Sequence, residues 1–239
     1  MSAGFSGKIA DLHCLQDCTP ETRERFEKEA SVFTLPKRSL CLRAGETNER
    51  VLFLLGGMVQ VYNLTGNGQK KILFLFGPDT MLNDNLFGSL TRAFCETMDR
   101  CTFAAVPRTA LLDMMRQDFA LTEALSRITE RRVWRLEHQL KNTVGSIYLE
   151  RKLAAKLWKL SRDFGVSDGR ETYIDAELSV TFLADLLGVP RETTSRVCKR
   201  LTEEGLIRLE NKRLYLPDPE GLSRFFRDGA SQQKKVEKP

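Results

Sequence analysis

The sequence predicts an α+β protein with an N-terminal β-roll, a long helix and a C-terminal winged helix-turn-helix domain. Short apolar runs separated by turn residues fill the chain from about residue 33 to 106, which is typical of a small all-β domain. A helical pattern without Gly or Pro extends from residue 118 to about 144. Two further helical patterns flank a Gly-Val-Pro turn within residues 178–207 and predict a compact helix pair.

These patterns divide the chain into five parts. We expect an N-terminal arm at 1–18, a β-roll at 19–115, a dimerisation helix with its hinge at 116–145, a winged-helix domain at 146–226 and a disordered tail at 227–239. With 239 residues, of which 41% are hydrophobic, the chain can bury two modest cores.

The strands of the roll follow from apolar alternation and from turn residues. A buried strand at 51–55 is followed by the turn Gly56-Gly57 and by an alternating strand at 58–62. A hairpin turn at 66–69 precedes a further strand at 71–76. Strands of this length and spacing favour a small sandwich or roll.

The long helix carries a narrow apolar stripe. Its residues follow a heptad that shifts by one position halfway: Leu121, Leu125, Ile128, Val133, Leu136, Leu140 and Val144. Such a stripe favours a two-stranded coiled coil with a second copy of the chain, although the β-roll could cover part of it. Gly145-Ser146 interrupts the pattern and is the expected hinge before the C-terminal domain.

The helix pair at 178–207 has clear boundaries. Gly188 ends the first helix, and Pro190 is pre-set for the start of the second. Val197 and Leu201 recur at helical spacing and should face inward, and Gly205 caps the end. A helix pair of this kind lays its second helix into the major groove of DNA.

The second helix presents side chains that can read base edges. An Arg fork matches guanine O6 and N7, and a carboxylate accepts from cytosine N4. Small hydroxyl residues let the helix approach closely and can bond phosphate. The candidate contacts with double-stranded DNA on this helix are Arg191, Glu192, Thr193, Thr194, Ser195, Arg196 and Lys199.

Two short strands after the helix pair predict a wing. They are expected at 206–210 and 213–216, around the turn Asn211-Lys212. Cations here and late in the second helix are expected to touch phosphates rather than bases: Lys199, Arg200, Lys212 and Arg213. Each of them could equally be an ordinary solvated charge.

The run from Arg191 to Arg196 resembles the recognition helix of the Crp–Fnr superfamily of transcription factors. It combines the leading Arg of the catabolite-activator branch with the Ser of the fumarate–nitrate-regulator branch. The resemblance implies a homodimer that binds a palindrome of half-sites close to TGTGA or TTGA, with RNA polymerase as an expected partner. Gly45-Glu46, the Gly57-x-Val-x-Val element and the Gly77-Pro78-Asp79 turn extend the resemblance to a cyclic-nucleotide-binding β-roll.

The phosphate cassette of cyclic AMP-binding relatives is altered in this chain. In those relatives a Gly-Glu pair holds the ribose and an Arg-Ser pair holds the phosphate. Here Asn83 and Asp84 stand in the first place, and Arg92 is followed by Ala93-Phe94. We therefore expect a small effector other than cyclic AMP, for which Asn83, Asp84 and Arg92 are the candidate residues. A constitutive DNA-binding protein whose roll has lost its effector is the alternative, and activation and repression both stay open.

Six cysteines leave the sensing chemistry open. The oxygen-sensing branch of the family holds an iron–sulfur cluster, and Cys14, Cys18, Cys95 and Cys101 could supply four thiolates, although their two-plus-two spacing departs from that branch. A thiol–disulfide switch at Cys14 and Cys18, on a mobile arm, is a second possibility. Cys101 and Cys198 have apolar neighbours and are expected to pack as small hydrophobes.

Composition and motifs exclude other classes of protein. The net charge of +5 is too small for a histone-like polycation. No apolar run is long enough to span a bilayer and no signal-peptide pattern is found, so we expect a cytoplasmic protein. The two histidines, His13 and His138, are far apart, and neither a phosphate-binding loop nor a nucleophile elbow occurs. We therefore do not expect an enzyme or a metal site of the zinc type.

Overall fold

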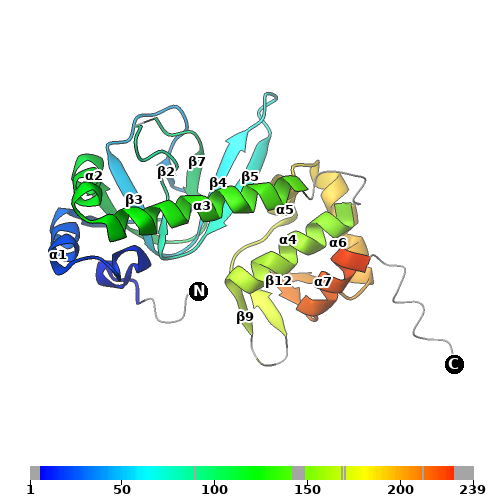
Figure 1. The fold of residues 1–239 in the computed structure, drawn as a ribbon. Coiled ribbons are helices and arrows are strands. Elements are labelled where there is room, and N and C mark those ends of the chain that lie inside the picture. Colours follow the sequence, from blue (N-terminus) through cyan, green and yellow to red (C-terminus); the bar gives the residue numbers. More distant parts are fainter. Residues whose placement is uncertain are drawn as a thin grey trace. The chain divides into compact units, whose positions relative to one another are not determined.

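The computed structural model describes residues 6–88, 90–141, 149–167, 169, 171–211 and 213–228. The chain divides into two compact units, residues 1–138 and 139–239, and Figure 1 shows the elements of both. The α+β class is confirmed. The expected hinge Gly145-Ser146, Lys212 of the wing and residues 229–239 of the expected tail lie outside the described residues.

The first unit contains a β-roll of two four-stranded sheets. Its strands are β1 (Ser31–Leu35), β2 (Leu40–Leu42), β3 (Arg50–Gly56), β4 (Val59–Leu64), β5 (Lys70–Phe76), β6 (Thr80–Met81), β7 (Phe94–Thr97) and β8 (Cys101–Pro107). One sheet has the order β1-β8-β3-β6 and the other β2-β7-β4-β5, with antiparallel pairing in both. The strands predicted at 51–55, 58–62 and 71–76 are confirmed as β3, β4 and β5.

In the sequence, helical segments precede and follow the strands of the roll. They are the 3-10 turns η1 (Ile9–Asp11) and η2 (His13–Leu15) and the α-helices α1 (Pro20–Glu29), α2 (Arg108–Gln117) and α3 (Phe119–Lys141). Asp118 joins three of these segments, because its carboxylate accepts from Thr19 N at 2.9 Å and from Ala120 N at 3.0 Å. The N-terminus of α1 is thereby tied to the junction of α2 and α3.

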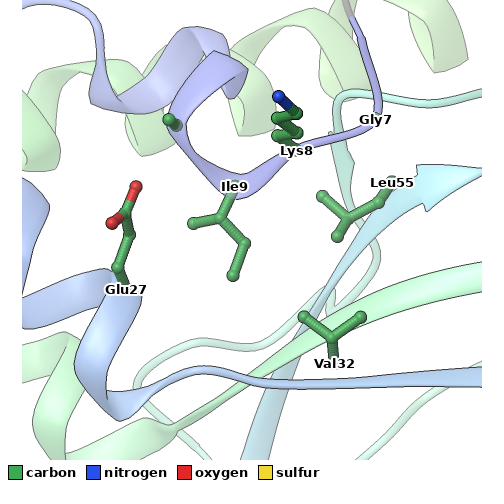
Figure 2. Close-up of a pocket in the computed structure, with 7 residues that line it drawn as sticks. Gly7, Lys8, Ile9, Glu27, Val32 and Leu55 are labelled. Carbon is green, nitrogen blue, oxygen red and sulfur yellow. The ribbon is translucent and has the colours of Figure 1, made fainter.

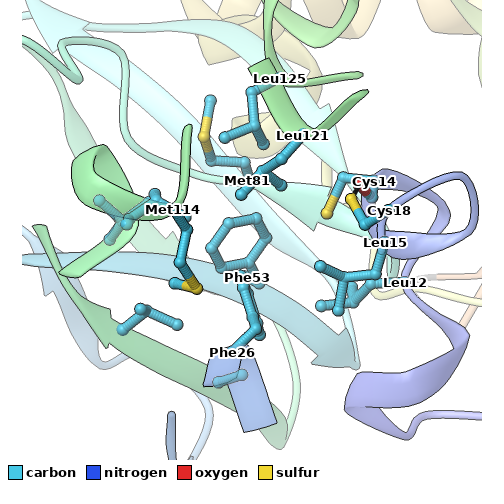
Figure 3. Close-up of a cluster of buried hydrophobic side chains, with 14 of the residues drawn as sticks. Leu12, Cys14, Leu15, Cys18, Phe26, Phe53, Met81, Met114, Leu121 and Leu125 are labelled. Carbon is cyan, nitrogen blue, oxygen red and sulfur yellow. Dashed lines mark hydrogen bonds between the residues drawn. The ribbon is translucent and has the colours of Figure 1, made fainter. Parts of the chain in front are cut away.

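The sheet β1-β8-β3-β6 separates two hydrophobic cores. Side chains alternate along β8, so that Ala104 and Val106 enter one core whereas Cys101 and Phe103 enter the other. We call the first the outer core; Figure 3 shows it between the sheet, the N-terminal turns and α3. The second, enclosed between the two sheets, is the inner core.

The prediction of a mobile N-terminal arm is wrong for the part of it that the structure describes. Leu12, Cys14, Leu15 and Cys18 are buried in the outer core, and Figure 3 shows them around Phe53. These four apolar side chains, from residues 12–18, cover the sheet, so their burial stabilises the segment. The short turns lack the repeat length from which a sequence pattern could indicate this.

Gly57 is a tightly packed turn position of the roll. Its φ is +85°, and an added Cβ would lie 2.7 Å from Arg100 O and 2.7 Å from Cys101 Sγ. Gly57→Ala is therefore expected to lower the free energy of unfolding by about 1–3 kcal/mol, measured by denaturant or thermal unfolding. Gly66→Ala is the matched control, because no atom lies within 4 Å of its added Cβ. Equal stability of the two variants would contradict this reading of the turn.

The second unit is the winged-helix domain. Its elements are α4 (Leu149–Phe164), β9 (Gly165–Ser167), β10 (Thr172–Ile174), α5 (Val180–Leu187), α6 (Arg191–Glu203), β11 (Arg208–Glu210), β12 (Arg213–Leu216) and α7 (Pro219–Asp228). The sheet order is β11-β12-β10-β9. The core buries Leu157 of α4, Leu183 of α5 and Leu201 of α6. The strands β9 and β10 and the helix α7 were not predicted from the sequence, and α7 places residues 227–228 in a helix rather than in a tail.

Among the described residues, no helix combines the length and the apolar character that a membrane span requires.

Candidate nucleic-acid interface

The turn between α5 and α6 has the predicted local structure. Ser179 caps α5 by accepting from Phe182 N at 3.1 Å. Gly188 ends α5 in the left-handed region, with φ 75°, and its N–H donates to Ala184 O at 2.7 Å. Pro190 has φ −55° and precedes the first residue of α6. The geometry fixes where α6 starts, and therefore which side chains face outward.

Helix α6 has a buried face and a polar face. The buried residues are Thr194, Val197, Cys198 and Leu201. The exposed residues are Arg191, Glu192, Ser195, Arg196, Lys199 and Arg200. At 3.6 residues per turn, the exposed residues from Arg191 to Lys199 fall within about 140° of arc. A single continuous polar strip therefore follows the N-terminal two-thirds of the helix.

Thr194 is a correction to the predicted contact set. Its side chain is fully buried, and its Oγ1 donates to Pro190 O at 3.2 Å. The hydroxyl stabilises the first turn of α6 and does not face solvent, so it is not available to a phosphate. Thr193 is half-buried at the edge of the strip, whereas Ser195 lies within it.

The cations of this domain differ in how they are held. Arg191 and Arg196 have no ion pair and no side-chain hydrogen bond to any residue that the structure describes. Lys199 lies 3.8 Å from Glu203, a long and exposed pair. Arg200 is tied back to α4, where its Nη1 lies 3.0 Å from Glu150 Oε1. On α6, in the part of the chain that the structure describes, Arg191 and Arg196 are thus the guanidinium groups free to bind an external acceptor.

The predicted wing is present as the β11–β12 hairpin. Its register pairs Leu209 with Leu214 and Glu210 with Arg213. Arg213 lies 3.5 Å from Asp175 and stacks over Tyr173 at 5.1 Å. The charge of Arg213 is therefore partly neutralised, which makes Arg213 a less favourable phosphate contact.

The structure does not bring the three candidate effector residues together. Asn83 is buried and holds β3, because its Oδ1 accepts from Leu52 N at 2.8 Å and its Nδ2 donates to Arg50 O at 3.0 Å. Its amide is thus used within the fold, which corrects its assignment as an effector ligand. Asp84 and Arg92 are exposed, with no hydrogen bond or ion pair between them among the described residues.

The contacts that Arg132 of α3 makes with the roll were not predicted from the sequence. Its guanidinium group donates to the carbonyl groups of Met81, Leu82 and Asn83, the last at 2.9 Å. It also stacks over the Phe76 ring at 4.9 Å. Burial lowers the pKa of its guanidinium to about 10. No periodicity in the sequence distinguishes this Arg from its exposed neighbour Arg131.

Arg132→Met is expected to destabilise the first unit by about 1–3 kcal/mol, because several hydrogen bonds from a charged donor are lost at once. Thermal unfolding, followed by circular dichroism, measures the effect. Arg131→Met is the matched control, since Arg131 is exposed on the same turn. A loss of stability no larger than that of the control would show that these hydrogen bonds contribute little.

The cysteines considered for an iron–sulfur cluster do not converge. Cys14 and Cys18 lie in the outer core, and Cys95 and Cys101 lie in the inner core on the other side of a sheet. Burial raises the pKa of Cys18 to about 11 and that of Cys101 to about 12. These residues therefore do not fit a shared four-thiolate site. Among the described residues, no group of three or more His, Cys, Asp or Glu side chains is placed to hold a metal ion.

A shallow pocket of about 400 Å³ lies on the outside of the roll (Figure 2). Its lining is mostly apolar and comes from the N-terminal segment, α1, β1 and β3: Gly7, Lys8, Ile9, Ala10, Glu27, Val32 and Leu55. None of the candidate effector residues or cysteines lines it.

Comparisons with known proteins identify both domains. Residues 32–118 match the family model of the cyclic nucleotide-binding domain, and residues 151–225 match that of the Crp-like helix-turn-helix domain. The chain is 24% identical over 221 residues to the CRP-like cAMP-activated global transcriptional regulator of Mycobacterium tuberculosis, covering 92% of this chain and 98% of that protein.

Solved structures share the fold. FixK2 from Bradyrhizobium japonicum matches with a TM-score of 0.71 and 21% identity, over 82% of this chain and 96% of its own. The c-di-GMP responsive global regulator CLP from Xanthomonas campestris matches with a TM-score of 0.68 and 21% identity, over 84% of this chain and 100% of its own. With its roll, its helix-turn-helix and these relatives, the chain belongs to the Crp/Fnr family of DNA-binding transcription regulators.

Proposed function

We propose that this regulator acts as a homodimer whose two α6 helices read the halves of a palindrome close to TGTGA or TTGA. The observation that carries the proposal is the polar strip of α6 with its two unpaired guanidinium groups, Arg191 and Arg196. Unpaired Arg forks at the N-terminal end of such a helix can make bidentate bonds to guanine O6 and N7.

The other residues of the strip have complementary roles in this proposal. Glu192 accepts from a cytosine N4 amine, and Ser195 is small enough to let the helix enter the groove. Lys199 and the wing residue Lys212 contact phosphate groups, which adds affinity for any sequence. Arg200 contributes little, because Glu150 already neutralises it.

The dimer proposal rests on the second half of α3. Leu121 and Leu125, at the start of the predicted seam, are fully buried against the protein's own roll. Further along the helix, Val133, Trp134 and Leu136 are 49%, 53% and 39% exposed. Large apolar side chains in a row on one helix mark an interaction surface. A second copy would cover them and place two recognition helices about one DNA turn apart.

Control by a small effector other than cyclic AMP, or by redox state, completes the proposal. Positions 83 and 84 do not form the Gly-Glu pair that holds the ribose in cyclic AMP-binding relatives, and the Asn83 amide is already bonded to the backbone of β3. The alternative is a constitutive regulator. It is favoured by Arg132, because this side chain of the same chain already donates to the carbonyl groups of residues 81–83. Operator affinity measured with and without added cyclic AMP, and with a small-molecule cell extract, distinguishes the two. We also propose RNA polymerase as the partner of the DNA-bound dimer.

Selection from a pool of random duplexes tests the proposed site. The purified full-length protein should enrich palindromes whose half-sites contain TGA and whose centres lie about 10 base pairs apart. Enrichment of a single, non-repeated half-site would reject the dimer arrangement. Recovery of the pool without enrichment would reject base reading by α6.

A further inference from the structure

Two cysteines that the sequence analysis did not pair lie on neighbouring strands of the roll. In the β2–β7 pair, Leu40 is opposite Glu96 and Leu42 is opposite Cys95. The register thus shifts by one residue, which makes Cys41 the extra residue of a β-bulge. Because two residues of a bulged strand oppose one residue of the partner, both Cys41 and Leu42 face Cys95.

The thiol group of Cys41 lies against Cys95. Cys41 Sγ donates to Cys95 O at 3.3 Å, and each of the two thiol groups shifts the pKa of the other. Both residues pack in the inner core. Cys41 is the bulge residue next to Leu42, whose Cα is opposite that of Cys95. Directly opposed residues in antiparallel strands have Cα atoms about 4.5–5.5 Å apart, and a disulfide spans about 4.4–6.8 Å. A disulfide between them therefore needs no large movement of the strands.

The two thiol groups differ in reactivity. The neighbouring side chain of Cys95 lowers the pKa of Cys41, against the effect of burial, and Cys41 is only partly buried. The side chain of Cys41, together with burial, raises the pKa of Cys95, while the nearby charge of Arg132 acts in the opposite direction. Since the thiolate is the nucleophile, an oxidant reacts first at Cys41, and Cys95 is placed to resolve the product.

The remaining described cysteines lack this combination. Cys18 Sγ donates to Cys14 O at 3.2 Å, but only 4% of Cys18 and 6% of Cys14 are exposed, and burial raises both pKa values. Cys101 is fully buried. Cys198 lies on the buried face of α6 and is the one cysteine of the second unit. Cys41 is thus the one described thiol that joins partial exposure to a neighbouring thiol.

We propose that Cys41 and Cys95 form a reversible dithiol–disulfide pair that is oxidised by hydrogen peroxide. The Cys41 thiolate attacks one peroxide oxygen, the O–O bond breaks, and the leaving hydroxide takes up a proton as Cys41 becomes a sulfenic acid. The Cys95 thiolate then attacks the Cys41 sulfur, and the S–O bond breaks with release of a second water. Two thiol groups lose two electrons and two protons, and one peroxide becomes two water molecules. A dithiol reductant restores both thiols.

This inference does not rest on the proposed DNA site, because the thiol groups react whether or not the protein binds an operator. It is tested on the full-length, fully reduced protein, treated with hydrogen peroxide, alkylated and mapped by peptide mass spectrometry. The expected result is the loss of two of the six free thiol groups, with the Cys41 peptide linked to the Cys95 peptide, and full recovery with dithiothreitol.

Variants separate the two roles. Cys95→Ala should stop at a sulfenic acid on Cys41 that dimedone labels, and Cys41→Ser should slow thiol loss by about tenfold or more. Cys198→Ala, the matched control, should form the same disulfide as the unaltered protein. Persistence of alkylatable Cys41 and Cys95 after other thiol groups are oxidised, or a disulfide between Cys14 and Cys18 or between chains, would overturn the proposal. The map of the unaltered protein decides this even if a variant fails to fold.

Discussion

Arg196→Ala is expected to weaken binding to the palindrome by about 1–3 kcal/mol for each half-site and to relax base preference at one position of it. The guanidinium is exposed on α6 and unpaired among the described residues, so its removal leaves no buried group without a partner. The folded domain should be as stable as before. Fluorescence anisotropy with the palindrome and with duplexes altered at single positions measures both the loss and its position.

Two other cations on α6 serve as controls for this prediction. Arg200→Ala removes the same chemical group from the same helix, but Glu150 already pairs with it, so base preference should not change. Lys199→Ala should weaken binding to all sequences about equally, because a phosphate contact carries no sequence information. If Arg196→Ala also weakened all duplexes equally, its assignment to a base edge would be wrong.

Leu136→Asp is expected to abolish the dimer and to reduce affinity for the palindrome to that for random DNA, a loss on the order of a thousandfold. Leu136 is 39% exposed on α3, and a carboxylate buried against its copy across a twofold axis would be strongly unfavourable. The monomer should still fold, because Leu136 does not belong to either core of the roll. Sedimentation equilibrium gives the oligomeric state, and anisotropy gives the affinity.

Arg131→Asp is the matched control for the dimer surface. By heptad spacing Arg131 lies on the side of α3 furthest from Val133 and Leu136, and it is exposed. This variant should remain a dimer with unchanged selectivity. A Leu136→Asp protein that stayed dimeric would show that the exposed part of α3 is not the subunit contact.

The winged-helix domain could be predicted largely from its sequence because its signals are local. Gly188 and Pro190 fix the turn, and the 3.6-residue period then assigns Val197 to the inside and Arg196 to the outside. Thr194 was misassigned because a hydroxyl can turn back to the carbonyl four residues earlier, a choice that residue type alone does not reveal. The strands β9 and β10 have three residues each, too few for an alternating pattern to be recognised.

The roll was predictable in outline, but the neighbours of its side chains were not. The contact between Cys41 and Cys95 joins positions 54 residues apart, and a one-residue bulge decides it. Arg132 reaches carbonyl groups about 50 positions earlier in the chain. Such pairs depend on strand register and on helix rotation, which nonlocal packing sets and which no short motif records.

Helix α3 lies between these two cases. Its heptad pattern correctly indicated a narrow apolar stripe, yet the same pattern is compatible with either of two partners. The first half, with Leu121 and Leu125, is covered by the roll, and exposed apolar groups begin again at Val133. Periodicity shows which face of a helix is apolar but does not show what covers it.

The most direct test of base reading by α6 is the ratio of affinities for the selected palindrome and for a shuffled duplex of equal length. Both are titrated with the unaltered protein at one moderate salt concentration, since phosphate contacts weaken with salt and base contacts much less. We expect tighter binding to the palindrome by about a thousandfold or more. Equal affinities for the two duplexes would contradict the assignment of Arg191 and Arg196 to base edges.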